Sequence, residues 1–162
     1  MKLKTTAFAI SILIGSASLM SGCASSGGGV SMPQASPTLV VQYSNPADKD
    51  ALNRAGMLNS FIDYWQSHLS KDWSHRYDLE KFSRPVDQKF YTAYHANAWP
   101  IRLLQVTGVN LTEQDATVNI TLTFFDPEKK RDILQYEQNK WTRVNGSWLH
   151  IASDPMLSGF SQ

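Results

Sequence analysis

The chain has 162 residues, enough for one domain, and its 15 Lys and Arg residues nearly balance its 14 Asp and Glu residues. Nucleic-acid binding needs clustered basic side chains that displace counterions from phosphates, and without such a block the sequence argues against a nucleic-acid partner. Hydrophobic residues make up 42% of the chain, which is sufficient for a packed core. Cys23 is the single cysteine, so the domain that follows it contains neither a disulfide nor a thiol nucleophile.

The first 22 residues have the three parts of an export signal peptide. Lys2 and Lys4 form a basic start, and residues 5–15 form an apolar run that is too short to span a bilayer. Small residues close the segment. We therefore expect residues 1–22 to direct export and to be removed.

Residues 19–23, LMSGC, resemble the lipobox of bacterial lipoproteins, although that pattern prefers Leu where this chain has Met20. The resemblance implies cleavage between Gly22 and Cys23, a diacylglycerol on Cys23 and usually a further acyl chain such as palmitate, which together anchor a protein stably to a membrane. Ala24, where an Asp would favour the inner membrane, implies the outer membrane facing the periplasm. The alternative is an ordinary cleaved signal followed by an unrelated cysteine.

Gly, Ser and Pro dominate the segment after Cys23, so we expect a flexible tether over residues 23–43 and one domain over residues 44–162. Residues 39–41 could add a short strand or pack on the domain. Asn45 is a suitable helix cap before Pro46. Apolar residues then recur at spacings of three and four, which predicts one helix to about residue 70 with this buried stripe: Ala51, Ala55, Leu58, Ile62, Trp65 and Leu69.

Two shorter helices are expected next, one after Asp72 and one over residues 88–98 with Asp87 as its cap. From Ile101 the apolar period changes to two, which predicts strands near residues 103–109, 116–125, 132–143 and 148–152. In the third of these strands Leu134 and Tyr136 share a face but Trp141 lies on the other, and a bulge near Gln138 would reconcile them. The pair Asn145-Gly146 predicts a tight hairpin. Helices followed by long antiparallel strands define an α+β class.

Two segments resemble the nuclear transport factor 2-like (cystatin-like) superfamily. They are residues 72–79, with Asp72-Trp73 and Tyr77-Asp78-Leu79, and the closing hairpin pattern of residues 141–151. The resemblance covers about residues 47–153. It implies a curved antiparallel sheet wrapped over the helices, a cone with a cavity at its wide end. It implies no activity, because the superfamily contains enzymes, adaptors and periplasmic assembly domains.

Enzymes with this fold, such as ketosteroid isomerase and scytalone dehydratase, place acids, tyrosines or histidines in the cavity. The corresponding candidates here show no spacing that such chemistry requires, so no catalytic residue is predicted; they are Asp63, Tyr64, Tyr77, Asp87, Tyr91, Tyr94, His95 and His150. No two histidines have the spacing that places both on one helical face, so neither a metal nor another cofactor is predicted.

We predict a lipid-anchored, non-catalytic envelope domain that binds a protein partner or a small apolar ligand on its concave sheet or in its cavity, within an envelope assembly. The candidate surface comprises Tyr77, Tyr91, Trp99, Thr121 and Thr123. The alternative is an isomerase- or dehydratase-like enzyme acting in the cavity. A buried carboxylate or histidine with a perturbed pKa would favour the enzyme, whereas an exposed apolar sheet face would favour the binding domain.

Overall fold

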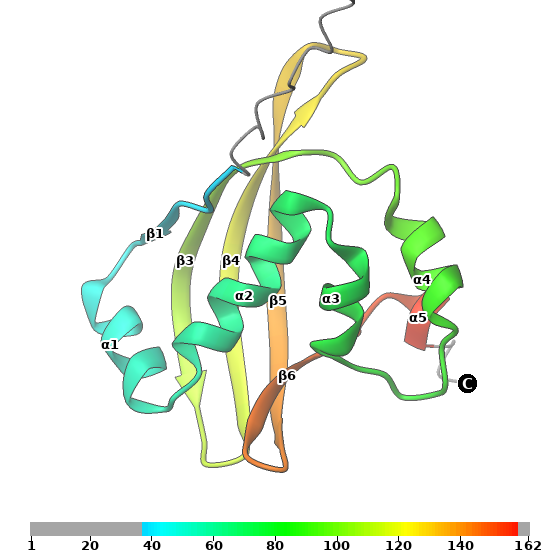
Figure 1. Cartoon of the computed structure of the whole chain (residues 1–162). Helices are drawn as coiled ribbons and strands as arrows, with labels where there is room; N and C mark the ends of the chain where they lie inside the picture. Colours follow the sequence, from blue (N-terminus) through cyan, green and yellow to red (C-terminus); the bar gives the residue numbers. More distant parts are fainter. Residues whose placement is uncertain (1–36, 159–162) are drawn as a thin grey trace, which may run out of the picture. The chain divides into compact units, whose positions relative to one another are not determined.

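The computed structural model describes residues 37–158, which form an α+β domain with a six-stranded mixed sheet (Figure 1). The predicted signal peptide, the Gly22–Cys23 cleavage point and the tether up to residue 36 lie outside the described residues. The elements in chain order are β1 Val41–Tyr43, α1 Pro46–Arg54, α2 Leu58–Ser70, α3 Trp73–Asp78, β2 Glu80–Lys81, α4 Gln88–His95, β3 Ile101–Leu111, β4 Asp115–Asp126, β5 Arg131–Val144, β6 Ser147–Ile151 and α5 Pro155–Ser158.

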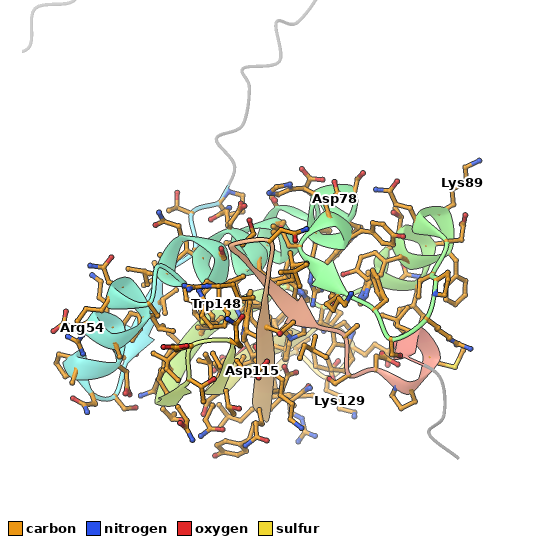
Figure 2. The ribbon with its side chains drawn as sticks, turned by 90° about the horizontal axis from the view of Figure 1, so that it is seen from below. Arg54, Asp78, Lys89, Asp115, Lys129 and Trp148 are labelled. Carbon is orange, nitrogen blue, oxygen red and sulfur yellow. The ribbon has the colours of Figure 1, made fainter. Side chains whose placement is uncertain are left out.

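The sheet has the strand order β1-β3-β4-β5-β6-β2. The four long strands pair antiparallel, while β1 runs parallel to β3 and β2 runs parallel to β6. Helix α2 lies across one face of this sheet, and the buried Trp148 of β6 lies between the helical layer and the strands (Figure 2). None of the helices between residues 37 and 158 has the length and apolar character that a membrane crossing requires.

The expected long helix is wrong, because the chain breaks into α1 and α2 at Gly56. Gly56 has a φ of +65°, and the backbone N–H groups of residues 55–57 already bond back to the end of α1. The restart turns α2 so that Phe61, Tyr64 and Trp65 face the core, whereas Ile62 of the predicted stripe is 37% exposed.

The bulge predicted near Gln138 is also absent. The pairing of β4 with β5 continues without a shift from Asp115–Thr142 to Asp126–Arg131. The register shifts of the sheet lie in β3 instead. Trp141 is therefore buried against the helices, while Leu134 and Tyr136 point away from them and are 59% and 78% exposed.

The Asn145-Gly146 hairpin is confirmed, and its two residues have φ values of 51° and 86°. Positive φ at both positions is the geometry of the tight turns that match strand twist. At the other end of the domain, Leu39 N donates to Gln66 Oε1 at 2.8 Å, and β1 pairs with β3. The folded unit thus begins before residue 44, because this segment supplies a strand.

Candidate functional site

A cavity of about 500 Å³ lies between the helical layer and the sheet. Its helical side is formed by Tyr64 and His68 of α2, Arg76 of α3 and Glu80 of β2. The sheet side comes from β4, β5 and β6, and residues 152–157 border it at the C-terminal end of the domain. The volume is typical of sites that hold a small molecule.

Glu80 is the centre of a buried polar network on the helical side. Glu80 is 8% exposed, and its Oε1 accepts hydrogen bonds from the hydroxyls of Tyr64 and Tyr91, each at 2.9 Å. Burial raises the pKa of both tyrosines, so they remain protonated donors. Burial of Glu80 opposes its charged form, but the hydrogen bond and charge of His150 and the charge of Arg76 outweigh it and lower its pKa.

Arg76 supplies the positive charge of this network. Its Nη2 lies 4.0 Å from Glu80 Oε1 and donates to the Tyr64 hydroxyl, and its guanidinium lies over the Tyr64 ring. Nη1 is 2.8 Å from His68 Nδ1. Because arginine can only donate, His68 accepts at Nδ1, and a neutral His68 carries its proton on Nε2. Burial, followed by the charge of Arg76, lowers the pKa of His68 to about 3.

His150 is held in a fixed orientation beside Glu80. Its Nδ1 is 3.2 Å from Glu80 Oε2, and its ring stacks on Tyr64 with the centroids 4.4 Å apart. Because the carboxylate accepts, Nδ1 donates, which leaves Nε2 of a neutral ring as an acceptor. His150 lines the cavity, so this imidazole is presented to whatever the cavity holds.

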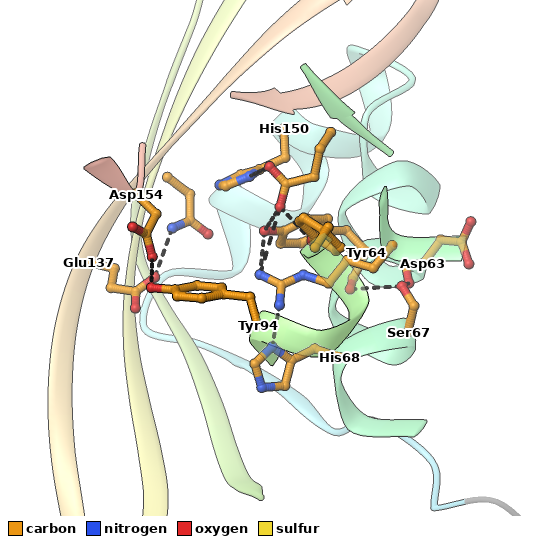
Figure 3. Close-up of polar contacts among 12 residues, drawn as sticks. Asp63, Tyr64, Ser67, His68, Tyr94, Glu137, His150 and Asp154 are labelled. Carbon is orange, nitrogen blue, oxygen red and sulfur yellow. Dashed lines mark hydrogen bonds and ion pairs between the residues drawn. The ribbon is translucent and has the colours of Figure 1, made fainter. Parts of the chain in front are cut away.

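The sheet side of the cavity is polar along β5. Gln135, Glu137 and Asn139 alternate along the strand and line the cavity. Gln135 Nε2 donates to Glu137 Oε1 at 2.6 Å, and Asn139 Nδ2 donates to Glu137 Oε2 at 3.1 Å. Asp154 also lines the cavity and accepts a hydrogen bond of 2.6 Å from the Tyr94 hydroxyl (Figure 3).

The residues that the sequence predicts to form one candidate surface lie in different places in the structure and differ in burial. Tyr91 is fully buried, with its ring against Phe82 and its hydroxyl on Glu80, so its inclusion in an exposed surface was wrong. Tyr77 is half-buried and donates to the carbonyl of Val86. Trp99 is 42% exposed.

Thr121 and Thr123 lie half-buried on the outer sheet face, away from the cavity. They pair across β4 and β5 with Tyr136 and Leu134, the two exposed apolar side chains of that face. These threonines therefore belong to a different surface from the cavity.

Of the acids, tyrosines and histidines weighed from sequence, four meet in or beside the buried network: Tyr64, Tyr91, His95 and His150. Asp63 is exposed and bonds to His75, and Asp87 caps α4. Sequence reasoning missed Arg76, Glu80, Glu137 and Asn139. Among residues 37–158, no three His, Cys, Asp or Glu side chains are grouped so as to hold a metal ion.

The fold and the cavity define an α+β domain with a polar interior site. No protein-family model matches the sequence, and no curated protein matches it. Among solved structures, a SEC-C motif containing protein from Rhodopseudomonas palustris is 14% identical, with 64% of this chain and 88% of that chain covered and a TM-score of 0.49.

A SEC-C motif containing protein from Psychrobacter arcticus is 12% identical, covers 68% of this chain and 62% of that one, and has a TM-score of 0.46. A candidate NTF2-like transpeptidase from Campylobacter jejuni is 11% identical, covers 67% of this chain and all of that one, and has a TM-score of 0.40. TM-scores below 0.5 establish neither a fold family nor a function.

Proposed function

We propose that this chain is a lipid-anchored protein of the bacterial cell envelope whose domain, nuclear transport factor 2-like in plan, binds a small polar ligand in its cavity. The lipobox-like segment ending at Cys23 supports the anchor. The buried network around Arg76 and Glu80, on the wall of the cavity, carries the ligand-binding part. We propose a polar ligand and not the small apolar one expected from the sequence, because charged and amide side chains line both the helical side and the sheet side of the cavity.

The energetics of the network favour a functional origin over a structural one. Removing Arg76 and Glu80 from water costs several kcal/mol per ion, and a buried pair of this kind often adds nothing to stability relative to apolar residues of the same volume. Buried titratable groups with shifted pKa values beside a cavity are instead typical of sites that bind or transform a ligand.

A thermal-shift experiment on the full-length chain in detergent tests the proposal. A panel of small amines, carboxylates, sugars and amino acids is added, and a ligand at a hundred times its Kd should stabilise the fold by about 2.7 kcal/mol. Gln135→Trp, at an exposed position that lines the cavity, should abolish the shift. Leu134→Trp, one residue away on the outer face, is the matched control and should keep it. A shift that survives Gln135→Trp, or no shift with any compound, contradicts the proposal.

The second candidate function is an enzyme. The buried carboxylate of Glu80 with its lowered pKa meets the criterion set out from the sequence for this alternative, and the Glu80–His150 pair favours it too. A carboxylate that holds Nδ1–H of an imidazole leaves Nε2 able to take a proton from a bound molecule, which is the role of a general base. Mass spectrometry of the bound compound before and after incubation separates the two functions. Conversion by the wild type, lost in His150→Gln with binding retained, would establish the enzyme.

A further inference from the structure

On the sheet side of the cavity, the negative charge of Glu137 has no positively charged side chain opposite it among those of residues 37–158 that line the cavity. Arg76 is the one Lys or Arg among the described residues that line the cavity, and both it and His150 are held by the same acid: Glu80 lies 4.0 Å from Arg76 Nη2 and 3.2 Å from His150 Nδ1, on the helical side. Burial, followed by the charge of Arg76, also lowers the pKa of His95 to about 4, so this histidine is neutral at neutral pH, as is His68. The two hydrogen-bond donors to Glu137 come from Gln135 and Asn139, which are neutral amides.

Asn139, next to Glu137 on the cavity wall, has a buried acceptor that lacks a donor. It is 4% exposed and lines the cavity. The Glu137 carboxylate can only accept, so the amide nitrogen of Asn139 must face it and the orientation of the amide is fixed. Its oxygen, Oδ1, is buried and receives no hydrogen bond from any side chain or backbone group in residues 37–158. A buried acceptor without a donor costs about 1–3 kcal/mol.

On the basis of the proposed function, we infer that the ligand carries a protonated amine, which binds between Glu137 and Asn139 Oδ1. An ammonium group supplies the missing positive charge and has three N–H donors, enough for a carboxylate and an amide oxygen together. Asp154 adds a second carboxylate to the same cavity. Leu122 and Phe124 of β4 line it too and offer an apolar surface for the carbon skeleton of such a molecule.

Three probes of equal length and different charge test the inference on the full-length chain in detergent: hexylammonium, hexan-1-ol and hexanoate. Hexylammonium should bind at least tenfold more tightly than either of the others in isothermal titration. Hexanoate tests the opposite preference, capture by Arg76. Calcium and magnesium ions are added separately, because a bare cation would also be attracted to carboxylates.

Two variants locate the amine. Glu137→Gln removes the charge at constant shape and should weaken hexylammonium binding tenfold or more, and Asn139→Leu should weaken it while the protein stays folded. Asp132→Asn is the matched control, since this carboxylate is on the outer face of the same strand and pairs with Arg102. It should leave binding unchanged.

The outcomes separate the inference from the proposed function. If hexanol or hexanoate binds as tightly as hexylammonium and Gln135→Trp blocks it, the cavity is a ligand site but the preference for an amine is refuted. Amine binding that is unaffected by both Glu137→Gln and Asn139→Leu overturns the assigned position, and a thermal shift from calcium or magnesium that depends on Glu137 replaces the amine with a metal. If no probe binds, the inference fails, and the wider panel with Gln135→Trp then decides the proposed function.

Discussion

The buried imidazole of His68 should make the domain lose stability in mild acid. The pKa of His68 lies at about 3 in the folded chain, against 6.5 for an unperturbed histidine, chiefly because the side chain is buried and secondly because of the positive charge of Arg76. A pKa lowered by folding gives stability that is complete above pH 6.5 and is lost as the pH falls toward the folded pKa, since the unfolded chain binds the proton first.

The size of this effect follows from the same values. One pKa unit corresponds to about 1.4 kcal/mol. Between about pH 7 and pH 4.5 the proton binds almost only to the unfolded chain, so His68 alone should lower the free energy of unfolding by about 2.5 kcal/mol. His68 is only 9% exposed, so solvent screening reduces this figure little.

Urea unfolding of the wild type and of His68→Gln at several pH values measures the effect. The glutamine amide oxygen can still accept from Arg76 but does not titrate, so the stability advantage of the wild type should shrink by about 2.5 kcal/mol over this range. Ser67→Ala, at a neighbouring buried position, is the control and should change the free energy equally at each pH. A wild-type advantage over His68→Gln that is constant with pH would refute the neutral, buried state of His68.

Three further predictions concern the anchor, the buried pair and the outer face. Cys23→Ala should prevent lipid modification and leave the protein unprocessed or mislocalised, whereas an unmodified cysteine in mass spectra of the mature wild type would contradict the anchor. Glu80→Gln should cost roughly 3–5 kcal/mol in urea unfolding because it leaves Arg76 buried without its counter-charge, while Glu128→Gln in an exposed loop should cost almost nothing. Lysine at Thr121 or Thr123 should reduce the recovery of a protein partner from membranes, and unchanged recovery would count against a partner on this face.

The sequence predicted the order and type of most elements but not the position of the site. Gly56 shows why the helix boundaries were missed. The spacing of apolar residues continues across this position, but its left-handed backbone ends one helix and starts another with a different buried face. Strand β2 shows why the position of the site was missed. Two residues have no measurable period, and Glu80 is placed only by pairing with His150 of β6, far along the chain.

The alternation along β5 contained the signal that could have located the cavity. Leu134 and Tyr136 lie on the opposite face of a regular strand from Trp141, and the sequence pattern alone favours a bulge near Gln138 to bring all three into the core. The strand instead keeps its parity, and the polar residues on the Trp141 face are the cavity wall. Apolar residues on the outside and amides on the inside break the usual rule for a sheet, and such departures are expected at functional sites.

The carbonyl of Ala55, where α1 ends, accepts hydrogen bonds from Arg143 Nη2 and Trp148 Nε1, which are 88 and 93 positions later in the chain. This end of the first helix is therefore completed only after the last hairpin has formed. Contacts over such sequence separations slow folding, because the loop between them must be closed first. A chain made from its N-terminus would thus stay without its native core until its final strand is available. If the chain is exported as we propose, the end of the first helix can be completed only after the final strand has also crossed the membrane.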